Sequence, residues 1–146
     1  MHFVLVDAVL ERTADRIVTI KAVSNAEEYL RDHFAGFPVL PGVFMLEAMV
    51  QAGRLLVQDR AGVGVVLGQV RALRYGRFVQ PGSSLRVEVT LIKESAGMWD
   101  CKGEATAVAP TGEAIGVAAS GRFSLRPVRL SIEAPAGAGS ATIGGT

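Results

Sequence analysis

The chain has 146 residues, 49% of them apolar and 20% charged, so one domain with a substantial core is expected. Fifteen basic residues nearly balance 14 acidic ones, which gives no bulk attraction to nucleic acid or to an anionic membrane. One cysteine and two distant histidines exclude a disulfide framework and a Cys-rich metal site, and no metal or cofactor is expected. No stretch is apolar enough to span a bilayer and none is typical of a signal peptide, so the sequence predicts a soluble, cytoplasmic protein.

The N-terminal part of the chain predicts a strand followed by a polar connection. Residues 3–10 are apolar around one aspartate, and residues 16–23 then alternate between apolar and polar side chains, which predicts the first strand. Residues 25–32 are mostly polar and predict a turn or a short helix.

The longest apolar segment runs from Val39 to Val57 and predicts one long helix. Pro41 and Gly42 open this segment and no further proline interrupts it, and proline is favoured in the first helical turn. Apolar residues occupy most of the helix circumference, so other elements have to cover several of its sides. We expect a sheet to supply this cover.

The remainder of the chain predicts an antiparallel sheet. Apolar and polar residues alternate along residues 85–91, which indicates a strand with one buried face. The Pro-Thr-Gly-Glu sequence at 110–113 is typical of a tight turn and predicts a hairpin. The expected strands are 64–71, 85–91, 98–109 and 114–125, with a turn at 80–83.

The fold class expected from this order is α+β, with an antiparallel β-sheet wrapped around one long central helix. Residues 1–130 are expected to form this single domain. From Ala134 onward the chain is nearly all alanine, glycine, serine and threonine, and so little apolar surface does not offset the entropy lost on ordering. We therefore expect residues 131–146 to be a disordered Gly/Ala-rich tail.

A histidine and a glutamate in and beside the predicted helix carry the strongest chemical signal. His33 lies in a Gly/Pro-rich loop ahead of the helix, and Glu47 lies inside the helix among apolar neighbours. A carboxylate is costly to bury there unless it is protonated or hydrogen-bonded. Gln51, one turn further on the same face, can supply that bond. The amide of Gly42 is one of the free N–H groups at the positive end of the helix dipole.

These groups suit the elimination of water beside a thioester. That reaction needs a base for the α-proton, an acid for the departing hydroxyl and a donor for the charge that develops on the thioester oxygen. His33 is the candidate base and Glu47 the candidate acid, with the Gly42 amide as the donor. For this role Glu47 has to keep its proton near neutral pH, which burial favours.

Each of these residues also has an ordinary structural interpretation. A loop histidine is more often structural or solvated than catalytic. Four polar residues of the helix recur at helical spacing and fit equally well a solvated stripe. They are Glu47, Gln51, Arg54 and Gln58.

Several segments in fixed order carry a family resemblance. They are His-Phe-Ala-Gly at 33–36, Leu-Pro-Gly-Val at 40–43 and Leu-Glu-Ala at 46–48, followed by Gln51. This set resembles the signature of the 3-hydroxyacyl-(acyl-carrier-protein) dehydratases of type II fatty acid synthesis, a family with the hot-dog fold. Residues 3–11 and 74–82 resemble the segments that flank the signature, so the resemblance covers most of the chain except the tail.

The resemblance implies specific roles and partners. It implies that His33 and Glu47 are the catalytic pair and that the Gly42 amide polarises the thioester carbonyl. Val39 would orient the histidine through its carbonyl, and Gln51 would support the carboxylate. The substrate would be a (3R)-3-hydroxyacyl chain on the phosphopantetheine arm of acyl carrier protein. Sites of the family are built from two subunits, so a homodimer is implied, with a hexamer of three dimers as an open alternative.

Three arginines and two departures from the family pattern complete the interpretation. Arg71, Arg74 and Arg77 are candidates for contacts with the acidic carrier protein, and a solvated strand edge is the alternative. Asp32 stands where the family commonly has glycine, and Ala35 where it usually has proline. These departures keep every catalytic group. They leave acyl chain length and pathway open, so a specialised dehydratase of a polyketide, aryl polyene or lipid pathway, or a drifted paralogue, is an alternative.

Other functions on the same fold remain open at this point. The same acid and base can hydrate an enoyl-CoA, and hot-dog proteins also include thioesterases and non-catalytic acyl binders. The carrier on the thioester distinguishes the hydratase from the dehydratase.

Overall fold

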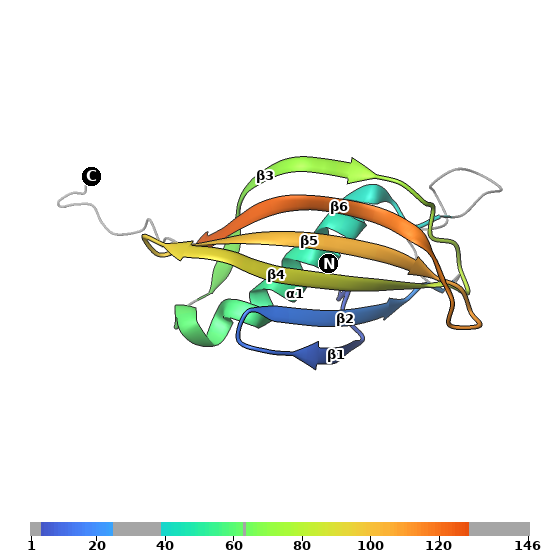
Figure 1. The fold of residues 1–146 in the computed structure, drawn as a ribbon, viewed down its shortest axis with the longest axis horizontal. Coiled ribbons are helices and arrows are strands. Elements are labelled where there is room, and N and C mark those ends of the chain that lie inside the picture. Colours follow the sequence, from blue (N-terminus) through green and yellow to red (C-terminus); the bar gives the residue numbers. More distant parts are fainter. Residues whose placement is uncertain (1–3, 25–38, 63, 129–146) are drawn as a thin grey trace, which may run out of the picture.

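The computed structural model describes residues 4–24, 39–62 and 64–128. Within these ranges the chain forms six strands and one helix (Figure 1), and no helix is long and apolar enough to cross a membrane. His33, the other residues of the 25–38 segment and the expected tail lie outside the described residues. The elements are β1 Ala8–Arg12, β2 Arg16–Ala22, α1 Gly42–Ala61, β3 Val65–Tyr75, β4 Ser84–Ser95, β5 Met98–Val108 and β6 Ala114–Pro127.

The six strands form one antiparallel sheet in the order β1-β2-β4-β5-β6-β3. The single helix α1 lies along one face of this sheet, behind the strands in the view of Figure 1, and it contacts β2 through β6. The expected α+β class, with an antiparallel sheet around one long helix, is confirmed. Both β1 and β3 are edge strands, each paired along one side.

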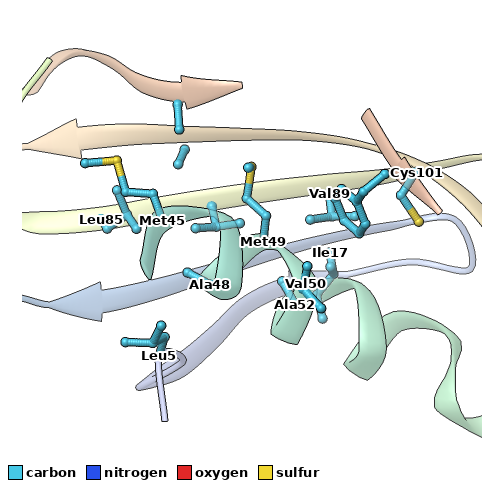
Figure 2. Close-up of a cluster of buried hydrophobic side chains, with 14 of the residues drawn as sticks. Leu5, Ile17, Met45, Ala48, Met49, Val50, Ala52, Leu85, Val89 and Cys101 are labelled. Atoms are coloured by element: carbon cyan, nitrogen blue, oxygen red, sulfur yellow. The ribbon is translucent and has the colours of Figure 1, made fainter. Parts of the chain in front are cut away.

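The core lies between α1 and the facing side of the sheet. Ala48 and Met49 of α1 and Leu85 and Val89 of β4 have no exposed surface, and Figure 2 shows them in one cluster. Gly103 of β5 brings the sheet backbone close to the helix, because a Cβ atom at this position would lie 2.7 Å from Sδ of Met49. A larger residue there would hold the helix away from the sheet.

The helix begins and ends later than its sequence pattern predicts. Pro41 is the N-cap residue in extended conformation, and Gly62 ends the helix in the left-handed region with φ of 70°. Leu40 lies outside the helix, and its N–H donates instead to the carbonyl of Val79 at 2.8 Å. Beyond Val57 the polar last turn stays helical until Gly62 provides the stop signal.

An additional strand precedes the predicted first strand. β2 confirms the strand expected at residues 16–23, but β1, which the sequence analysis did not predict, pairs with it. All five residues of β1 are exposed, so no alternation of buried and exposed positions marks the strand. Its place is set by long-range bonds instead, such as the one from the N–H of Ala22 to Oδ2 of Asp7 at 2.7 Å.

The C-terminal hairpin is confirmed, while β3 is longer than expected. Between β5 and β6 the N–H of Ala109 donates to the carbonyl of Glu113 at 2.8 Å. β3 continues past the predicted end at Arg71 to Tyr75, through a register shift at Ala72, which has φ of 53°. The bulge lets the strand bend with the sheet and carries its end toward the start of α1.

Candidate active site

An apolar cavity of about 350 Å³ lies at the N-terminal end of α1. Its wall includes Val39 and Gly42 at the helix start and Arg77 after β3. The apolar lining comes mainly from Leu40, Val43, Met45, Tyr75, Phe78 and Ala118. The cavity therefore lies where the sequence analysis places the candidate donor amide.

Three backbone hydrogen bonds form this cavity from distant segments. The N–H groups of Gly76 and Arg77 each donate at 2.9 Å to β6, to the carbonyls of Ala118 and Val117. The bond from Leu40 to Val79 then fixes the residues before α1 against the segment after β3. The end of β3 and the start of the helix are thereby joined in one wall.

Gly42 is the part of this wall that belongs to the start of the helix. It is the first residue of α1 after the N-cap, so its N–H has no carbonyl one turn earlier in the helix to bond. The aromatic ring of Tyr75 lies directly against it, where a side chain at residue 42 would otherwise be. The positive end of the helix dipole therefore lies at the wall of the cavity, beside the Tyr75 ring.

Glu47 is held by two side chains of the same helix. Nε2 of Gln51 donates to Oε2 of Glu47 at 3.0 Å, and Nη2 of Arg54 donates to the same oxygen at 3.1 Å. The amide of Gln51 is oriented in turn, because its Oε1 accepts the N–H of Leu5 at 2.8 Å. Gln51 is therefore fixed at both ends of its amide, by Leu5 and by Glu47.

The side chain of Glu47 is 41% exposed in the single chain, which differs from the burial expected for it. The apolar neighbours Met45, Ala48 and Met49 face the core, whereas Glu47 lies on the stripe that the sheet leaves uncovered. The solvated-stripe interpretation fits Gln58, which is exposed. It does not account for the hydrogen bonds that join Glu47 to the two residues after it on the stripe.

Two of the three candidate carrier-binding arginines lie on the outer face of the sheet, and the third lines the cavity. In the register of β3 and β6, Arg71 lies opposite Arg122, and Arg74 lies opposite Ser120. Residues 120 and 122 share the face opposite to the buried Phe123, so these two arginines lie on the outer face of the sheet. Arg77 lines the apolar cavity, and it is the only one of the three to do so.

Comparison with known proteins decides the family. The family described as the FabA-like domain matches residues 1–110. The chain belongs to the FabA-like family. This FabA-like chain is 43% identical over 108 residues to a 3-hydroxyacyl-(acyl-carrier-protein) dehydratase FabZ of Solibacter usitatus, with 71% of this chain and 67% of the relative covered. It is 38% identical over 104 residues to the FabZ of Thermotoga neapolitana, with 70% and 75% covered.

Solved structures confirm the hot-dog fold of this FabA-like chain. The dehydratase heterocomplex ApeI:P of Xenorhabdus doucetiae superposes with a TM-score of 0.64 at 21% identity, covering 88% of this chain and 85% of that chain. An acyl-CoA hydrolase of Agrobacterium tumefaciens gives a TM-score of 0.64 at 16% identity, covering 82% of this chain and 45% of that chain. Dehydratase and hydrolase share the architecture, so the fold alone does not distinguish these reactions.

Two residues of the candidate site have no assigned role in the sequence analysis. Arg54 appears there only as a member of a polar stripe, although its position seven residues after Glu47 already predicts a shared face. Tyr75 has no local signal, because its contact with Gly42 depends on how β3 meets the helix. His33 lies outside the described residues, so its distance from Glu47 is not described.

Proposed function

We propose that this protein dehydrates 3-hydroxyacyl thioesters on acyl carrier protein to trans-2-enoyl thioesters, with His33 as the base and Glu47 as the acid. The supporting observation is a carboxyl group held by Gln51 on α1, five residues after Gly42, which begins the helix and lines the apolar cavity. The two FabZ relatives, at 38% and 43% identity, are named for the same dehydration reaction. Fatty acid biosynthesis is the pathway class that this activity serves.

The proposed reaction balances within the substrate and two side chains. His33 takes the α-proton, and the electron pair of that C–H bond forms the new double bond as the C–O bond at the β-carbon breaks. Glu47 gives its proton to the departing hydroxyl, which leaves as water. Charge that develops on the thioester oxygen is stabilised by the Gly42 amide. Val39 orients the histidine in this proposal, and it supplies part of the cavity wall.

The complete site is proposed to need two copies of the chain. Glu47 and the cavity are partly open in one copy, and a second subunit would cover the uncovered stripe of α1 and contribute its His33. β3 supports this assembly, since it is an edge strand of 11 residues with one side unpaired within the described sheet. A homodimer is the proposed unit, and three dimers could assemble into a hexamer.

The proposed partner is an acidic acyl carrier protein in the cytoplasm. Arg77 lies at the cavity and is exposed, so it is the primary candidate for contact with the carrier or its phosphopantetheine arm. Arg71 and Arg74, on the outer face of the sheet, would contribute longer-range attraction. The single cysteine is buried, which is compatible with a reducing compartment.

The test is the reverse reaction, hydration of crotonyl carrier protein and crotonyl-CoA, followed by the loss of enoyl-thioester absorbance. We expect preference for the carrier protein, and we expect His33→Ala and Glu47→Gln to lower turnover about 10²–10⁴-fold while the protein remains folded. Full activity of a folded His33→Ala variant would refute the assignment. Preference for crotonyl-CoA would instead indicate a hydratase, and release of free thiol would indicate a thioesterase.

A further inference from the structure

Two side chains of α1 converge on one oxygen of Glu47. Gln51 and Arg54 both donate to Oε2, at 3.0 and 3.1 Å. The Gln51 amide is itself fixed, since its oxygen accepts the N–H of Leu5. Leu5 has only 1% of its surface exposed, so this anchor belongs to the core of the domain. Within the described residues, no hydrogen bond reaches the second oxygen, Oε1.

Arg54 reaches Glu47 because the helix aligns them. Seven residues make almost two turns of about 3.6 residues each, so the two side chains lie on the same stripe of α1. Both are partly shielded, with 37% of the Arg54 side chain and 41% of the Glu47 side chain exposed. Isolated ion pairs at such exposure contribute little to stability, so removal of Arg54 should leave the fold intact.

We propose that Arg54 is a positioning residue for Glu47. With two donors on Oε2, the carboxyl group cannot turn freely about its last bond, and Oε1 is left as the oxygen that meets the substrate hydroxyl. The inference rests on the proposed function, because it takes Glu47 to be the acid. It adds a cation to the site that neither the reaction nor the family resemblance assigns.

The charge of Arg54 favours the carboxylate form of Glu47, which is the product of proton transfer in dehydration and the starting form in hydration. Glu47 becomes a carboxylate as it gives its proton to the departing hydroxyl, and a guanidinium already in hydrogen-bond contact stabilises that negative charge without rearrangement. In the hydration direction the same contact holds the carboxylate that takes a proton from water. The effect should therefore appear in turnover rather than in substrate binding.

The experiment is a double-mutant cycle between Arg54 and Glu47, measured as crotonyl carrier protein hydration with the enzyme as a full-length oligomer. We expect Arg54→Met to lower kcat about tenfold or more with KM changed less than about twofold. Arg54→Lys should recover part of this loss, because it keeps the charge. In a Glu47→Gln background, with residual rates measured at excess enzyme, Arg54→Met should cause no further loss.

Arg60 provides the matched control. It lies on the same helix, forms an ion pair with Glu94 at 3.5 Å and bonds the carbonyl of Ala14, yet it has no contact with Glu47. Arg60→Met should keep the wild-type kcat. Fluorescence of Trp99, the single tryptophan, reports whether each variant is folded. Arg54→Gln is the second variant should Arg54→Met fail to fold.

The outcomes separate the two proposals. Wild-type kcat in Arg54→Met, while Glu47→Gln is inactive, overturns the role of Arg54 and leaves the proposed function standing. An equal loss from Arg54→Met in the wild-type and in the Glu47→Gln background overturns it too, since Arg54 would then act elsewhere. Full turnover in Glu47→Gln refutes the acid assignment itself, and the positioning role with it.

Discussion

The ring of Tyr75 occupies the space that a side chain on Gly42 would need, because a Cβ atom at Gly42 would lie 2.8 Å from Cε1 and 2.9 Å from Cζ of that ring. The contact joins the end of β3 to the first turn of α1. Both residues line the apolar cavity, so the contact makes the size of residue 42 a determinant of the cavity's shape.

Gly42→Ala is expected to change activity more than stability. Tyr75 is 53% exposed, so its ring can turn away from the added methyl group. The displaced ring would narrow or reshape the cavity mouth. We expect a raised KM for the acyl substrate with a melting temperature close to that of the wild type.

The control for Gly42→Ala is the double variant with Tyr75→Ala, which removes the ring. It should bring KM back toward the value of Tyr75→Ala alone. Unfolding of Gly42→Ala would contradict the prediction, because it would show that the ring cannot move.

Gly103→Ala is expected to destabilise the fold. The added Cβ would lie 2.7 Å from Sδ of Met49 and 3.1 Å from Cε1 of Phe123, and both side chains are buried in the core. Overpacking of this kind typically costs about 1–3 kcal/mol. Urea unfolding followed by the fluorescence of Trp99, which is 3% exposed, measures the change.

Gly64→Ala is the matched control for the core glycine. Its Cβ would meet only Val128, at an ordinary 3.4 Å, so its free energy of unfolding should change by about 0.5 kcal/mol or less. Adding Met49→Ala to Gly103→Ala should relieve the clash, and the two changes should then be non-additive. Equal stability of the Gly64 and Gly103 variants would contradict the close approach of α1 and β5.

Cys101 should make stability depend on pH above 9. Burial, and secondarily the charge of Asp100, raises the pKa of the Cys101 thiol from 9.0 to about 12. Between these values the unfolded chain loses the thiol proton and the folded chain keeps it. The stabilisation is therefore fully present below pH 9 and is lost as the pH rises, by roughly 1 kcal/mol between pH 9 and 10.

The measurement for the thiol is urea unfolding of wild type and Cys101→Ala at several pH values, since other groups also titrate in this range. The wild type should lose more stability than the variant as the pH rises. Native Cys101 should also react slowly with iodoacetamide at pH 8, and rapid labelling in the folded state would contradict its burial.

Arg77→Glu should weaken the use of acyl carrier protein selectively. Arg77 lies at the cavity, and reversal of its charge would repel an acidic carrier. We expect KM for crotonyl carrier protein to rise about tenfold and its dependence on salt to fall, with little change for a neutral crotonyl thioester that lacks phosphate. Arg12→Glu, on the opposite edge strand β1, gives the same change in net charge and should have a much smaller effect.

The elements with strong local signals could be predicted from the sequence. The unbroken apolar segment after Pro41 predicts α1, and the alternation along residues 85–91 predicts the centre of β4. These signals are periodic and local, so a single segment carries them. The order of His33 and Glu47 with their flanking residues likewise indicates the family from the sequence alone.

Only the tertiary structure decided the features that depend on distant segments. β1 is a strand because it pairs with β2, next to the bond from the N–H of Ala22 to Asp7, and Tyr75 reaches Gly42 because a bulge bends β3 toward the helix. The spacing of the polar residues on α1 is the same for a solvated stripe and for a functional one, so it does not distinguish the two interpretations. Which interpretation holds at Glu47 depends on hydrogen bonds from Arg54 and from Gln51, whose amide is bonded to Leu5. Helical spacing sets the face of the helix on which a residue lies. It does not set which other parts of the chain pack against that face.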